Sequence, residues 1–293
     1  MTIKKITALL MLSVLPLGVL TAQEEKDYLP KAGDLAIGID MQPVYSFFGN
    51  LFADGNGALN GLGQFGGEDA LGLTGLSIMG KYMLDNTTAL RVNIGIDKTF
   101  THDYDYSIDD EARFLNPLSE AKVEDLAKRN RAAYSIAAGI EFRKGNNRIQ
   151  GFYGADLVLG INKDRYTFAY GNAITDVNQT PSRNNYNGLG MGVAPLNYWS
   201  ATYITESYQN NIILGLAGRV GVEYFVVPQL SFGGEMTLLI GERFDKGSYT
   251  KSEGYNPTTA QVESHTELEF PASRAFHIGT ENLGGKLFMM FYF

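Results

Sequence analysis

Cysteine is absent from the 293-residue chain. This absence excludes disulfide-stabilised scaffolds, zinc sites built from thiolates, cysteine nucleophiles and anchoring through a lipidated cysteine. Basic residues are also few, because 24 Lys and Arg stand against 32 Asp and Glu, a formal net charge of -8. Nucleic-acid binding requires a positively charged surface, so we expect no nucleic acid among the partners of so acidic a chain.

Long apolar runs are missing too, except at the N-terminus. Two lysines precede an apolar stretch from Ile6 to Leu20, and a small residue, Ala22, follows it. This layout is typical of a cleaved export signal, so we expect residues 1–22 to be a signal peptide and residues 23–293 to form one mature domain. An uncleaved membrane helix is the alternative, but it needs a longer run, of about 20 residues. The mature chain is then secreted, periplasmic or an outer-membrane β-barrel.

Glycine and aromatic residues are abundant, with 34 Gly, 17 Tyr and 17 Phe. Such a composition favours strands and turns over helical bundles. Apolar and polar residues alternate along eight stretches, which is the period of a β-strand with one apolar face. The clearest alternation has branched apolar residues at every second position from Leu90 to Ile96. The predicted strands are residues 35–48, 72–83, 88–100, 132–144, 148–161, 208–226, 230–241 and 276–293.

The connections between these strands alternate in length. Three are short and rich in turn formers, at residues 84–87, 145–147 and 227–229. The others are long, at about 49–71, 101–131, 162–207 and 242–275. This layout predicts an all-β fold, an eight-stranded antiparallel transmembrane β-barrel with short periplasmic turns and four long extracellular loops.

A ten-stranded barrel is the alternative. It requires a hairpin within residues 162–207, where Tyr166–Tyr170 and Tyr198–Tyr203 resemble strands. These two segments could instead extend the neighbouring strands.

The polar faces of the predicted strands decide which side faces inward. They carry small residues and charges of both signs, which suits a lumen where ion pairs satisfy one another, whereas the opposite faces are aliphatic with aromatic ends, as lipid requires. A soluble secreted β-protein, with the apolar face inward, is the alternative. The predicted lumen residues are Lys81, Arg91, Asp97, Glu141, Arg143, Asp156, Arg219, Glu223, Glu235 and Lys286.

The C-terminal segment Leu287–Phe293 ends in aromatic residues. It resembles the insertion signal that the barrel-assembly machinery reads, with Phe291 and Phe293 as the signal residues. The mature chain resembles small barrels of the OmpX, OmpW and OmpA-transmembrane type, and Arg148–Ala155 is similar to segments of Bacteroidota outer-membrane barrels. The resemblance implies a Gram-negative outer membrane, contact with its lipid and lipopolysaccharide, and assembly by that machinery. It implies no particular activity.

An acidic stretch follows the third predicted strand. Asp103, Asp105 and Asp109 place carboxylates at alternate positions and could hold calcium, although Ile108 stands where an EF-hand requires glycine. A solvated acidic loop is the alternative. Further on, residues 116–130 are predicted to form a short helix with Pro117 at its first position, either packing on its neighbours or covering the barrel mouth.

One glycine pattern invites a cofactor interpretation. Gly61–Gly66 matches the dinucleotide-binding spacing G-x-G-x-x-G. That motif requires a preceding strand, a following helix and a later acidic residue, whereas these glycines lie in a glycine-rich connection of an exported chain. We interpret the segment as a loop and expect no cofactor.

Catalytic groups are few. The histidines are His102, His265 and His277, and no serine stands at a spacing that would pair it with one of them on a strand face. We therefore expect no enzymatic activity, and a lipid-modifying enzyme is the least supported alternative. An eight-stranded lumen is filled by side chains, which disfavours a wide pore.

The leading hypothesis is a structural or interaction barrel, either an accessory subunit of a larger outer-membrane complex or a surface-binding protein. A narrow channel or binder for a small, apolar solute is the second hypothesis.

Overall fold

The structure is a computed structural model that describes residues 28–41, 76–184, 202–278 and 283–293. The described chain forms one antiparallel sheet of ten strands and one short helix, α3 (Asp110–Leu115). The predicted all-β antiparallel fold is thereby confirmed. The strands are β1 (Leu35–Asp40), β2 (Leu76–Met83), β3 (Thr88–Ile108), β4 (Lys122–Asn146), β5 (Ile149–Ala169), β6 (Thr202–Val227), β7 (Leu230–Asn256), β8 (Gln261–Phe270), β9 (Ser273–His277) and β10 (Leu283–Tyr292).

The pairing of the strands closes into a ring. Strands β1 to β7 are neighbours in chain order, and β10 pairs with both β7 and β1. Strands β8 and β9 stand outside this ring, and each of them pairs with β7. Eight strands therefore form the ring, and ten form the sheet.

The ring has eight strands, as predicted for the barrel, whereas the sheet has two more. These two strands come almost entirely from the region expected to be a long loop, residues 242–275, and the described parts of residues 162–207 contain no hairpin. Along β7, β10 pairs with Leu230–Leu238, β9 with Gly241–Asp245 and β8 with Ser248–Asn256. Strands β10, β9 and β8 thus pair with successive segments of β7, one after another along the strand.

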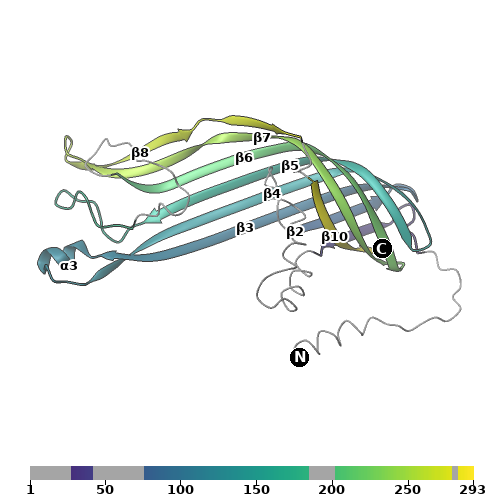
Figure 1. The fold of residues 1–293 in the computed structure, drawn as a ribbon, viewed down its shortest axis with the longest axis horizontal. Helices are drawn as coiled ribbons and strands as arrows, with labels where there is room; N and C mark the ends of the chain where they lie inside the picture. The colour runs from purple at the N-terminus through teal and green to yellow at the C-terminus, as the bar shows by residue number, and fades with distance from the viewer. Residues whose placement is uncertain (1–27, 42–75, 185–201, 279–282) are drawn as a thin grey trace, which may run out of the picture.

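The sheet continues far beyond the ring. Figure 1 shows β3 to β8 running on as a long curved wall, while β1, β2 and β10 lie at one end. Within the described residues, β3 pairs with β2 as far as Ile96, and its pairing with β4 continues to Ile108. We call the part of the sheet beyond the ring the wall.

The wall corrects three of the four predicted long loops. Most of residues 101–131, residues 162–169 and 202–207 at the two ends of the third predicted loop, and most of residues 242–275 belong to strands, whereas residues 170–184 do not. The segments near Tyr166 and Tyr203 extend β5 and β6, which was the second of the two interpretations of those residues. Polar residues occupy both faces of the wall, so alternation of apolar and polar residues did not reveal these strands. The predicted loop at residues 49–71 and the glycine pattern Gly61–Gly66 lie outside the described residues.

The predicted helix at residues 116–130 is wrong. Helix α3 ends at Leu115, Asn116 is its C-cap, and residues from Lys122 onward belong to β4. Asp109 begins α3 by accepting a hydrogen bond from the backbone N–H of Ala112 at 3.0 Å. The segment 122–130 is instead a strand because its backbone pairs continuously with β3, and such pairing outweighs local helix propensity.

Among the described residues, no helix has the length and apolar character needed to span a membrane.

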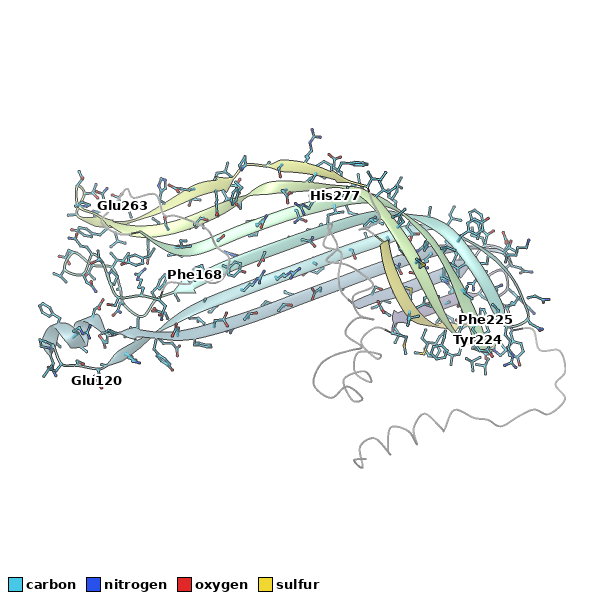
Figure 2. All side chains as sticks on the ribbon, in the orientation of Figure 1. Glu120, Phe168, Tyr224, Phe225, Glu263 and His277 are labelled. Atoms are coloured by element: carbon cyan, nitrogen blue, oxygen red, sulfur yellow. The ribbon has the colours of Figure 1, made fainter. Side chains whose placement is uncertain are left out.

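The ring has opposite polarity on its two faces. Leu90, Ile94 and Leu216 point away from the interior and are 43%, 44% and 62% exposed, whereas Arg91 and Glu223 are buried inside. Figure 2 shows Tyr224 and Phe225 at the turn end of the ring, with Glu120 and Glu263 at the far end of the wall.

A two-residue turn joins β4 to β5. Asn146 pairs with Ile149, and Asn147 between them has a φ of 58°. Asparagine and glycine tolerate this left-handed conformation, whereas a β-branched residue does not.

We expect Asn147→Val to lower the free energy of unfolding by about 1–2 kcal/mol and Asn147→Gly to change it by less than about 0.5 kcal/mol. Urea unfolding in detergent micelles, followed by circular dichroism, measures both effects. Lys144→Val at an exposed, extended position of β4 is the control. An equal loss at both positions would contradict the role of backbone conformation.

Candidate functional site

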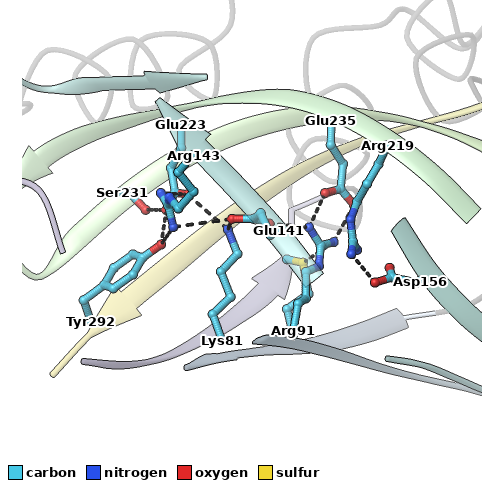
Figure 3. A network of polar contacts seen from close by, with 11 residues as sticks. Lys81, Arg91, Glu141, Arg143, Asp156, Arg219, Glu223, Ser231, Glu235 and Tyr292 are labelled. Atoms are coloured by element: carbon cyan, nitrogen blue, oxygen red, sulfur yellow. Dashed lines mark hydrogen bonds and ion pairs between the residues drawn. The ribbon is translucent and has the colours of Figure 1, made fainter. Parts of the chain in front are cut away.

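Charged side chains from several strands meet inside the ring. Alternate positions on a strand face opposite sides of the sheet, so each of these residues comes from the inward-facing set of its strand. Figure 3 shows the resulting network of hydrogen bonds and ion pairs. It joins Lys81, Arg91, Glu141, Arg143, Asp156, Arg219, Glu223, Ser231, Glu235 and Tyr292.

Glu223 is the centre of the half of the network that lies nearer the turns. Its carboxylate accepts hydrogen bonds from Arg143 at 2.6 Å, from Lys81 at 3.1 Å and from the Tyr292 hydroxyl at 2.8 Å. Ser231 donates a fourth hydrogen bond to it. The side chains of Lys81, Arg143 and Glu223 are fully buried, so this carboxylate exchanges its water shell for protein donors.

Arg91 and Glu235 form the strongest pair of the other half. The Arg91 guanidinium donates two hydrogen bonds to Glu235, at 2.6 and 2.7 Å, a bidentate geometry that favours strong binding. Glu141 connects the two halves, because it lies 2.9 Å from Lys81 and 3.3 Å from Arg91. Arg219 pairs with Asp156 beyond them.

The charges within the ring balance. Lys286, which is only partly buried, donates a hydrogen bond to Ser77 near the same network. Counting the charged residues of the network together with Asp40 and Lys286 gives five cations and five carboxylates, so this layer is neutral although it is rich in ions; Asp97 lies beyond it on β3. The cations are Lys81, Arg91, Arg143, Arg219 and Lys286, and the carboxylates are Asp40, Glu141, Asp156, Glu223 and Glu235.

Aromatic side chains fill the space between the charges. Phe152 and Phe288 are almost fully buried, and the Lys81 ammonium lies 4.9 and 5.3 Å from their ring centroids. The Arg143 guanidinium lies 5.7 Å from the ring of Tyr292. Such contacts stabilise a cation that has left water. The interior of the ring at this level is therefore packed with side chains.

Nine of the ten predicted lumen residues lie in or beside this network, and all nine point inward. Asp97 shares the inward-facing positions of Arg91 on β3, but it is half-buried, lies six residues beyond Arg91 and joins none of the ion pairs among the described residues. Tyr292 was not among the predicted site residues, although it shares the inward-facing positions of Lys286 and Phe288 on β10. Its partners come from β4 and β6, so only the assembled ring reveals its role.

The predicted signal residues Phe291 and Phe293 are both exposed at the end of β10. Their proposed recognition during assembly remains a prediction.

The predicted calcium ligands are not brought together. Asp103 and Asp105 lie on β3, whereas Asp109 caps α3. Among the described residues, no three His, Asp or Glu side chains are placed to share a metal ion. The histidines are likewise separate. The β7 partners of His265 and His277 are Ser252 and Gly241, about 36 Å apart along the strand.

Two other aspartates organise the far end of the wall. Asp125 is fully buried and accepts hydrogen bonds from the backbone N–H groups of Gly171 and Asn184, both at 2.8 Å. Asp110 accepts hydrogen bonds from the Ser182 N–H at 2.7 Å and from the Asn178 amide at 2.8 Å. These bonds fasten residues 170–184 to α3 and β4. We call this arrangement the tip knot.

Arg183 anchors the same segment. Its guanidinium lies between the rings of Tyr170 and Tyr203, 4.3 and 4.1 Å from their centroids, and pairs with Glu253 at 3.1 Å. Planar stacking combined with an ion pair holds a guanidinium in one orientation. The tip knot is thus a preorganised surface.

Comparison with known proteins adds little to this description. No family model matches the chain. No curated protein matches its sequence. Among solved structures, the outer membrane protein OprG from Pseudomonas aeruginosa aligns with 92% of this chain and 99% of its own, at 14% identity and a TM-score of 0.33.

We expect Glu223→Gln to destabilise the protein by about 3–5 kcal/mol, because among the described residues it leaves Glu141 as the one carboxylate that neutralises the two buried cations Lys81 and Arg143. Urea unfolding in detergent gives the value. Glu124→Gln, on an exposed outward position of β4, is the matched control and should change stability by less than about 0.5 kcal/mol. A small loss at Glu223 would show that the network contributes little.

The tip knot should respond to acid. Burial opposes ionisation of Asp110, but the hydrogen bonds from Asn178 and Ser182, together with Arg113, lower the pKa of this carboxyl below its ordinary value of 3.8. A lowered pKa stabilises the knot above pH 3.8, and this contribution disappears as the pH falls through the folded-state pKa. The protection factor of the Ser182 amide, its hydrogen-exchange rate relative to the intrinsic rate at the same pH, should fall over that acidic range. In Asp110→Asn, the same acid-dependent step should be absent.

Proposed function

We propose that this chain is a non-enzymatic outer-membrane β-barrel whose ring crosses the lipid, whose interior is sealed, and whose wall presents an interaction surface outside the membrane. One observation supports the membrane position above all others: the ring has ions inside and aliphatic side chains outside. A water-soluble protein avoids so large an exposed apolar surface, and lipid requires one.

The dimensions of the outward-facing band support the same proposal. On β4 the outward positions run from Phe142 through Ile140, Ala138 and Ile136 to Tyr134, with aromatic residues at both ends. This segment has nine residues, and a transmembrane strand needs about 9–11. Aromatic residues are enriched at both interfaces of membrane proteins, so Phe142 and Tyr134 mark the two edges.

The filled ring argues for a structural role over a diffusion channel. Lys81, Glu141 and Glu223 are fully buried, and opening a path would separate ion pairs within a low-dielectric interior. We therefore propose that no substantial solute flux passes through the ring. The alternative of a narrow channel would require this network to rearrange.

The wall supports an interaction role. Strands β3 to β7 are 21–27 residues long, about twice what a membrane crossing needs, so much of each strand projects beyond the band. The tip knot stiffens its far end, and a preorganised surface binds a partner at a lower entropic cost. We propose that the wall contacts a larger outer-membrane complex or a surface ligand. The dispersed histidines favour a non-enzymatic role.

A pair of leucine substitutions tests the membrane position. We expect Leu216→Arg, within the outward-facing band, to destabilise the protein in lipid bilayers by about 2–4 kcal/mol. Leu268→Arg makes the same change at a similarly exposed position of the wall on β8 and should cost less than about 0.5 kcal/mol. Unfolding by urea from lipid vesicles gives both values. Equal tolerance of the two substitutions would contradict the proposal.

Two further measurements separate the functional alternatives. Liposomes that contain the purified protein should show no swelling in sugar solutions, and measurable swelling would favour the channel. Affinity purification in a gentle detergent, followed by mass spectrometry, should recover a defined envelope partner. Loss of that partner after Arg183→Ala, with the ring still folded, would assign the contact to the tip knot, whereas recovery of a monomer alone would contradict a role in a complex.

A further inference from the structure

The wall contains a pocket of about 300 Å³ on strands β4, β5 and β6. This volume is at the lower end of the range of small-molecule sites. Lys163 borders it from an outward-facing position of β5, and its remaining polar lining consists of the side chains of Arg129, Arg131, Asn162, Asp164, Gln209 and Asn211.

The register places these side chains on the inward face of the wall. Asn162 and Asp164 share the alternating positions of Asp156 on β5, and the pairing of β5 with β4 and β6 continues unbroken between them. Asn162 lies six residues beyond Asp156, about 20 Å along the strand. The pocket therefore lies above the sealed network, on the side from which the ring would be entered.

The charge of the pocket is positive. Arg129 is neutralised by Asp164, with hydrogen bonds of 3.1 and 2.6 Å, and its guanidinium lies 5.0 Å from the ring centroid of Tyr166. Arg131 lines the same pocket, and no ion pair holds it within the described part of the chain. Because arginine remains protonated, this side chain offers a fork of donors suited to a carboxylate or a phosphate.

Side-chain amides form the rest of the lining. Asn162 and Asn211 are direct partners in the register of β5 and β6, and Gln209 is next on the same face. The Asn211 Oδ1 atom is covered yet has no hydrogen-bond partner among the described residues. A buried amide oxygen without a hydrogen bond destabilises the fold. After a small rotation of the Asn211 side chain, a hydroxyl group of a ligand would donate a hydrogen bond to this oxygen.

The backbone beside the pocket is irregular. The partners of Gln209 and Asn211 on β7 are Ser248 and Asp245, so β7 carries an extra residue there, and Gly247 within it has a φ of 88°. A bulge of this kind redirects neighbouring side chains and is frequent beside binding sites. The bulge in β7 lies directly opposite Gln209 and Asn211, the two β6 residues whose amide side chains line the pocket.

We propose that this pocket binds a small acidic sugar, with the carboxylate on Arg131 and the hydroxyls on the amides and Asp164. One anion and several hydroxyls match one unpaired guanidinium and a set of groups that both donate and accept hydrogen bonds. An apolar solute has no counterpart in this lining. The site is independent of the proposed membrane position, because its residues belong to the wall.

Isothermal titration of the detergent-solubilised full chain with D-glucuronate tests the site, with D-glucose as the neutral probe and inorganic phosphate as the anion without ring hydroxyls. We expect glucuronate to bind at least tenfold more tightly than either. Arg131→Gln and Asn211→Asp should each weaken glucuronate binding about tenfold, the first by removing the cation and the second by repelling the carboxylate. Lys128→Gln makes the same charge change on the outward face of β4 and should leave binding unchanged.

Several outcomes would overturn the proposal: no glucuronate binding, phosphate bound as tightly as glucuronate, or equal effects of Arg131→Gln and Lys128→Gln. Circular dichroism confirms that each variant is folded before titration. Vesicles of a glucuronate-headgroup glycolipid identify the source of the sugar. Competition between these vesicles and free glucuronate would support the site with a membrane glycolipid as its ligand, whereas binding of free glucuronate alone would support it with a soluble one.

Discussion

Neutralisation of buried charge is the constraint on which the rest of the structure depends. Five cations and five carboxylates occupy the inside of the ring, and a buried ion without a partner is strongly destabilising. Glu223 needs donors from β2, β4, β7 and β10, so the network is satisfied only when the strands stand in a single register. The ion pairs thus specify closure of the ring, and the exposed aliphatic face that results accounts for the proposed position in lipid.

The wall continues the same strands under different constraints. Among the described residues, β3 has no β2 partner beyond Ile96, and the inward positions of the wall carry polar groups around a pocket instead of ion pairs in a packed interior. Order at the far end depends on local fastening, chiefly Asp125, Asp110 and Arg183 in the tip knot. One sheet can therefore combine a sealed part in the membrane with a presenting part outside it, which is the division of roles that we propose.

Sequence patterns predicted the ring better than the wall. Alternation from Leu90 to Ile96 located β3 because one face meets ions and the other is aliphatic, but it located only the ring portion of the strand. From Thr101 to Ile108 large side chains still alternate with Asp, Ser and Thr, but the acidic positions led to the prediction of an acidic loop instead of a strand. The helix predicted at residues 116–130 was wrong for a different reason. The segment has local helix propensity, but residues 122–130 form backbone hydrogen bonds with β3, and this pairing outweighs the propensity.

The sequence by itself determined the strand class, the polarity of the two faces and the inward-facing positions of the predicted lumen residues, because these properties depend on the period of a single strand. Only the tertiary structure decided which charges pair. Arg91 and Glu235 are 144 residues apart, and Tyr292 reaches Glu223 across 69. The tertiary structure also shows that three separate strands pair with β7 and that Asp103 and Asp105 lie on β3 while Asp109 caps α3. It brings residues of β4, β5 and β6 together around the pocket at Arg131. Each of these outcomes depends on contacts between strands, which a pattern within one strand does not contain.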